Sequence, residues 1–94
     1  MSQISARRDA RSNAAQQHWI AERLLDRSPT PVTHVRPTFF AELLISFGRS
    51  IATDNVLRLP LADARHAPVA TDDQAQVIAA ILEDPEPHRG QIYP

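Results

Sequence analysis

The sequence contains no cysteine, no lysine and only two glycines among its 94 residues. Without cysteine the chain has no disulfide framework, no thiolate zinc site and no thiol nucleophile. Gly48 and Gly90 lie far apart, and neither follows a strand and opens a helix, so a Gly-rich phosphate-binding loop is missing. Ten basic residues stand against eleven acidic ones, a formal net charge of −1, which excludes the overall positive field that direct nucleic-acid binding uses.

Long apolar runs are missing as well. The N-terminus lacks the apolar core of a secretion signal, and the most apolar stretch, Phe39 to Phe47, is short and contains Glu42. We therefore expect no membrane segment and a cytoplasmic location. The four histidines are scattered without ligand spacing, so we expect no metal site.

The length predicts one small unit, in which a sheet covered on both faces is difficult to complete. Residues 1–11 are polar without an apolar period, and we expect them to form a flexible N-terminal segment. Residues 12–94 contain all the periodic patterns.

Three stretches have the periodicity of helices. Ser12 to Arg27 contains neither Gly nor Pro and gathers small residues on one face, and Phe39 to about Ser50 repeats large apolar residues at intervals of three and four. The third stretch opens at Thr71 with the Thr-Asp-Asp-Gln pattern of a capping box and ends before Pro85.

Three shorter stretches have the composition of strands: Val32–Arg36, Val56–Leu59 and Gln91–Tyr93. Helices and strands therefore alternate, which predicts an α/β fold with a mainly parallel sheet. Such sheets bind ligands outside the carboxyl ends of their strands. The candidate positions are Pro37, Thr38 and Phe39 after the first strand and the loop Ala62–Val69 after the second.

Two charged residues allow two interpretations each. His18 lies one turn before Glu22, so the two can form a functional pair in which the carboxylate favours the charged imidazole, or a structural pair. Arg36 stands directly before Pro37, where it can anchor a neighbouring segment through a carboxylate or bind a ligand phosphate.

The run from His18 to Phe40, HWIAERLLDRSPTPVTHVRPTFF, resembles the NmrA-like branch of the atypical short-chain dehydrogenase/reductase family. In that pattern a helix carrying His-x-x-x-Glu is followed by a strand ending in R-P-T-x-F and by another helix. The family's V-x-x-x-D-x-A helix and h-G-x-x-Y strand are similar to the segment from Val56 to Pro94. The resemblance implies that residues 12–94 form the C-terminal portion of an NmrA-like NAD(P)-binding domain. The implied fold is a partial, Rossmann-like part of a doubly wound parallel sheet, with about three helices and three short strands.

The resemblance also implies a division of labour in the site. Pro37, Thr38 and Phe39 would lie beside the nicotinamide end of NAD(P), and His18 stands where related reductases place the lysine of their Tyr-x-x-x-Lys pair. Arg65 and His66 would line the entrance of the substrate pocket. Ala14 occupies the position of the proton-donating tyrosine, so no catalytic residue is expected.

The leading hypothesis is a truncated NmrA-like NAD(P)-binding protein, either a cofactor-sensing regulator or an oxidoreductase-like protein acting on quinones and similar carbonyl compounds. Its phosphate-binding half is missing, so we do not expect independent cofactor binding. One alternative is a non-catalytic interaction module that self-associates or binds a protein through the Phe39–Phe47 helix. The other is an autonomous NAD(P)H-dependent quinone or carbonyl reductase.

Overall fold

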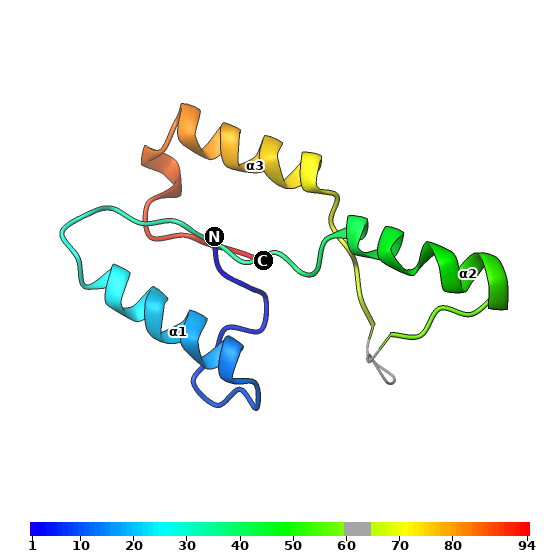
Figure 1. Cartoon of the computed structure of the whole chain (residues 1–94). Helices are drawn as coiled ribbons and strands as arrows, with labels where there is room; N and C mark the ends of the chain where they lie inside the picture. The colour runs from blue at the N-terminus through cyan, green and yellow to red at the C-terminus, as the bar shows by residue number, and fades with distance from the viewer. Residues whose placement is uncertain (60–64) are drawn as a thin grey trace.

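The computed structural model describes residues 1–59 and 65–94, which form three α-helices, two short 3-10 helices and a two-stranded parallel sheet (Figure 1). Strand β1 (His34–Val35) pairs with β2 (Ile92–Tyr93), with His34 opposite Ile92 and Val35 opposite Tyr93. The elements between the two strands make the connection that parallel pairing requires. The predicted α/β class with a parallel sheet is therefore confirmed in this small form.

The N-terminal segment runs beside β1 on the edge opposite β2. The amide of Ser2 donates to the carbonyl of Val35 at 2.7 Å, and the amide of Ile4 donates to the carbonyl of Pro37 at 3.0 Å. From the first bond to the second, the donor moves from Ser2 to Ile4 and the acceptor from Val35 to Pro37. The segment therefore runs parallel to β1. Residues 1–11, expected to form a flexible segment, thus include two residues that are hydrogen-bonded to the sheet.

Helix α1 (Asn13–Asp26) confirms the first predicted helix. The Ser12 hydroxyl caps it by accepting from the amide of Ala15 at 3.5 Å, and Arg27 closes the other end. Ala15 and Glu22 are its buried residues, so the face turned inward is small and partly charged. The helix therefore brings a carboxylate into its contact with the residues of the first strand and its end.

The two faces of β1 are covered by different helices. His34 and Arg36 contact α1, whereas Thr33 and Val35 line a cavity with Ile81 of α3 (Thr71–Glu83). This alternation is the two-residue period of a strand. Figure 1 shows the result, with α1 and α3 on opposite sides of the strand pair.

The predicted strand over Val56–Leu59 is wrong, because these residues are irregular and largely exposed. Val69 pairs instead with Phe40 in an isolated parallel bridge, in which the amide of Val69 donates to the carbonyl of Phe39. A β-branched run forms a strand only beside a partner, and Val56–Leu59 lies away from the sheet. Of the predicted loop Ala62–Val69, residues 62–64 fall outside the described residues, as does Pro60.

The middle helix begins later than predicted, and the last helix begins at Thr71 as predicted but without the expected cap. The 3-10 helix η1 (Ala41–Phe47) leads into α2 (Gly48–Asp54), so the predicted Phe39–Ser50 helix starts two residues later and extends four further. In α3 the predicted capping box is absent, since Ala70 is the cap residue and no side chain caps the helix. The amide of Thr71 donates instead to the Glu42 carboxylate at 2.9 Å, which takes the place that a capping box gives to the Gln74 side chain, and the amide of Gln74 donates to the carbonyl of Ala70.

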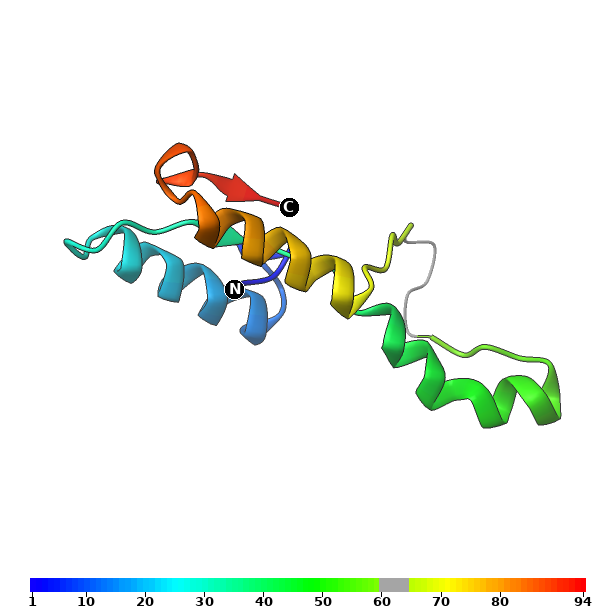
Figure 2. The same ribbon diagram turned by 90° about the horizontal axis from the view of Figure 1, so that it is seen from above.

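The chain is extended, with principal dimensions of 52 × 32 × 17 Å. Its radius of gyration is 16.1 Å, against about 12 Å for a compact domain of this length. Figure 2 shows the cause, because η1 and α2 project away from the rest of the molecule. We call residues 41–59 the arm, and we call the N-terminal segment, α1, α3 and the two strands the body.

Candidate functional site

A cavity of about 340 Å³ opens at the carboxyl end of β1. Three of its lining residues follow β1 directly, three come from the parallel N-terminal segment, and one comes from the stretch before Val69. They are Pro37, Thr38, Phe39, Gln3, Ile4, Ser5 and His66. Parallel sheets place their ligands at this end, and the volume falls at the lower end of the range for small-molecule sites.

Two contacts hold the segment around His66 over the cavity. The rings of Phe39 and His66 lie 5.5 Å apart between centroids at an angle of 55°. The Thr38 hydroxyl donates to the carbonyl of Ala67 at 3.0 Å. Aromatic faces and neutral polar groups therefore form the walls, a combination suited to a flat, uncharged ring with polar substituents.

The predicted site residues are divided by this geometry. Pro37, Thr38, Phe39 and His66 lie together, as the sequence predicts for a site at the end of the strand. Among the described residues, the lining does not include His18, which instead borders a smaller cavity of about 100 Å³ beside Glu22 and His34. Nor does it include Arg65, which is exposed.

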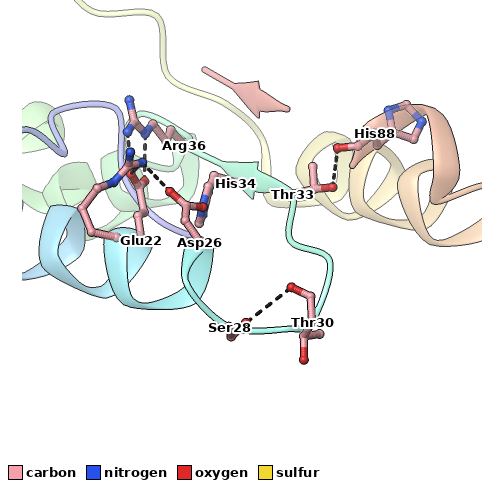
Figure 3. Close-up of polar contacts among 9 residues, drawn as sticks. Glu22, Asp26, Ser28, Thr30, Thr33, His34, Arg36 and His88 are labelled. Carbon is pink, nitrogen blue, oxygen red and sulfur yellow. Dashed lines mark hydrogen bonds and ion pairs between the residues drawn. The ribbon is translucent and has the colours of Figure 1, made fainter. Parts of the chain in front are cut away.

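Glu22 pairs with Arg36 rather than with the histidine one turn before it. The Arg36 guanidinium donates from Nε to Oε1 at 2.8 Å and from Nη2 to Oε2 at 2.5 Å (Figure 3). Within the described part of the chain, His18 makes no hydrogen bond or ion pair. The structural interpretation of Arg36, an anchor for a neighbouring segment, is the one that the geometry supports.

Glu22 and Arg36 each stabilise the charged form of the other in the contact layer between α1 and β1. Glu22 is 2% exposed, and its hydrogen bonds from Arg36 lower the pKa of its carboxyl from 4.5 to about 2. The same contact raises the pKa of Arg36 above its ordinary value. Both groups are therefore charged at neutral pH, and each neutralises the other in a buried position.

A second polar contact continues the layer by one turn of α1. His34 Nε2 lies 2.7 Å from Asp26 Oδ1, and Arg23 Nη2 lies 2.9 Å from Asp26 Oδ2. Sequence reasoning missed this contact. The signal that could have revealed it is the match between two acidic residues four apart on a helix and two basic residues two apart on the next strand.

On the opposite side, Thr33 and the C-terminal residues are joined by polar contacts. The Thr33 hydroxyl donates to the carbonyl of His88 at 2.6 Å (Figure 3), and His88 Nδ1 lies 2.7 Å from the Tyr93 hydroxyl. These bonds fix the approach of β2 to β1. They support the site without lining it.

In the part of the chain that the structure describes, no helix combines the length and apolarity needed to cross a membrane. The same residues contain no cluster of three or more His, Asp or Glu side chains arranged to hold a metal ion. Comparison of the chain with protein-family models, with curated proteins and with solved structures finds no match in any of the three.

Proposed function

We propose that this chain forms the nicotinamide-side wall of an NAD(P) site of the NmrA-like type, in a partial Rossmann-like fold. The observation that carries the proposal is the cavity at the carboxyl end of β1, which joins Pro37, Thr38 and Phe39 to His66. The parallel pairing and the helices on both faces of β1 are consistent with such a fold.

The chemistry of the walls suits a nicotinamide ring. Phe39 and His66 offer aromatic surface against which a planar ring can pack. The Ser5 and Thr38 hydroxyls and the Gln3 carboxamide supply neutral donors and acceptors for the ring's own carboxamide. A Gly-rich turn for the diphosphate is missing from the sequence, so we expect the nicotinamide end to bind weakly and the diphosphate to add little.

The proposal favours cofactor sensing over reduction of a carbonyl substrate. Ala14 occupies the position where the resemblance implies a tyrosine, and a methyl group has no proton to donate. If the protein reduces a carbonyl substrate, another residue must therefore donate the proton. Oxidation of NADPH by a quinone in the presence of the native chain, and its loss in His18→Ala, would support the oxidoreductase hypothesis.

The test is an amide NMR titration of the chain with reduced nicotinamide mononucleotide, with adenosine monophosphate as the ligand control. We expect shifts confined to Gln3–Ser5, Thr38, Phe39 and His66, with a dissociation constant in the millimolar range. Thr38→Val should weaken them, because it removes the hydroxyl that holds the segment at Ala67. Thr53→Val is the matched control, since its hydroxyl bonds only within α2.

Equal shifts with adenosine monophosphate, or shifts centred outside the cavity, would overturn the proposal. If Thr53→Val weakened the shifts as much as Thr38→Val does, this would also count against the proposal. The two variants differ only in where the hydroxyl is removed.

A further inference from the structure

The chain exposes more surface than a compact monomer. A folded protein of this size exposes about 5,400 Å², whereas this chain exposes 7319 Å², a difference of about 1,900 Å². Among the described residues the buried apolar side chains are few and mostly alanine: Ala6, Ala10, Ala15, Val35 and Ile81. Large apolar side chains, among them Ile45, Leu24 and Leu82, are therefore left exposed.

The arm carries much of this surface. Neither η1 nor α2 contains a buried residue. Ile45, in η1, is 76% exposed, and Leu43 and Ile51 are exposed before and after it in the sequence. The described contacts that tie the base of the arm to the body are the Phe40–Val69 bridge and the bond from Thr71 to Glu42.

We propose that the arm is a homodimer interface, in which the arms of two copies pack antiparallel about a twofold axis between Ile45 and Ser46. A twofold contact uses the same patch on both copies, so the residue nearest the axis meets its own counterpart. Ile45, the most exposed large apolar residue, lies beside this axis and is then covered by Ile45 and Ser46 of the second copy. The proposal does not rest on the nicotinamide site, because Ile45 is not among the residues that line that cavity.

The charges of the arm favour a second copy over a different partner. Glu42 and Arg49 stand at equal distances in sequence from the proposed axis, so antiparallel packing brings Glu42 of each copy opposite the partner's Arg49. Arg49 forms no ion pair within the described part of its own chain. Asp54 and Arg58 pair with each other at 3.8 Å, which leaves the arm with no net charge and two copies with no mutual repulsion.

The chain leaves surface for a second copy to cover. A specific interface of standard size removes about 800 Å² from each partner, and the whole chain, body and arm together, exposes about 1,900 Å² more than a compact monomer of its size.

Light scattering after gel filtration tests the proposal at chain concentrations from the low micromolar range upward. We expect the mass of a dimer for the native chain and of a monomer for Ile45→Glu, which places two carboxylates together at the axis. Like charges there should weaken association by about 100-fold or more. Leu82→Glu is the matched control, because Leu82 is 71% exposed on α3 and should leave the dimer intact.

Gly48→Leu provides a second variant that tests the same face without adding charge. A Cβ built at Gly48 meets nothing within 4 Å, so the isolated chain accepts a side chain there, whereas a partner helix packed close would not. We expect a folded monomer, with helix content by circular dichroism equal to that of the native chain.

Cysteine cross-linking locates the axis. The chain has no native cysteine, so Ile45→Cys carries a single thiol, which should oxidise to a covalent dimer if the two copies meet there. Leu82→Cys should remain a non-covalent dimer and form no covalent cross-link under the same conditions, as denaturing electrophoresis without reductant would show. A monomeric native chain at every concentration, a dimer that survives Ile45→Glu, or a dimer broken by Leu82→Glu instead would each overturn the proposal.

Discussion

The body and the arm are ordered by different means. In the body, β1 is covered on both faces, and the layer against α1 holds a buried Glu22–Arg36 pair with two hydrogen bonds. In the arm, neither η1 nor α2 contains a fully buried residue, and the described hydrogen bonds lie within the helices and at the base. Where a chain has little apolar core, specific polar contacts determine the arrangement, and the arm has few of them with the body among the described residues.

The largest expected effect comes from breaking the buried pair. Glu22→Gln removes the charge that neutralises Arg36, and we expect the free energy of unfolding to fall by up to about 3 kcal/mol, because the partly buried Arg36 guanidinium is left without its counter-charge. Trp19 lies on α1, so its fluorescence during denaturation reports on the body. Glu83→Gln, at an exposed position of α3, should change stability by less than about 0.5 kcal/mol. Equal losses in the two variants would contradict the assigned role of the pair.

The next effect is a pH dependence of the body. Folding lowers the pKa of Glu22 from 4.5 to about 2, so the unfolded chain takes up a proton first as pH falls. The stabilisation is complete above about pH 4.5 and is lost towards pH 2, with a contribution of about 3 kcal/mol at most. Other carboxylates also titrate in this range, so the measurement is the difference between the native chain and Glu22→Gln. A difference that stays constant from pH 6 to pH 2 would show that the pair does not control this dependence.

The smallest effect is expected at the junction between arm and body. The hydrogen bond from the backbone amide of Thr71 lowers the pKa of the Glu42 carboxyl. Because Glu42 is exposed, this contact orders the junction while contributing little to the free energy of unfolding. In Glu42→Ala the Thr71 amide should exchange its hydrogen several-fold faster, with an unchanged unfolding midpoint. Glu42→Gln retains an acceptor oxygen and should retain the protection. Fast exchange in the native chain would contradict the contact.

The sequence is sufficient to predict the elements whose periodicity is strong. The helix over Ser12–Arg27, the strand around His34 and the strand at Tyr93 appear where the pattern places them. The strand over Val56–Leu59 fails because composition does not reveal whether a pairing partner is near. The Thr71 cap fails because the competing acceptor, Glu42, lies 29 residues away.

The sequence predicts only part of the candidate site. Pro37, Thr38 and Phe39 can be placed at the end of the strand from parallel-sheet rules alone. Gln3 and Ser5 cannot, because backbone bonds from Ser2 and Ile4 bring them there, and such bonds leave no pattern in side-chain identity. The pairing of Glu22 with Arg36 joins two elements, so periodicity within either one does not reveal it.

The alternation of side chains along β1 makes the ion pair a check on strand alignment during folding. A slip of one residue would turn Arg36 towards the apolar side of α3 and leave the buried Glu22 facing Val35, which is a heavy penalty. A slip of two would keep the polar face but offer Glu22 the imidazole of His34, which cannot donate two parallel bonds to one carboxylate. Of these three alignments, the native one satisfies both oxygens, so the ion pair fixes the position of β1 along α1.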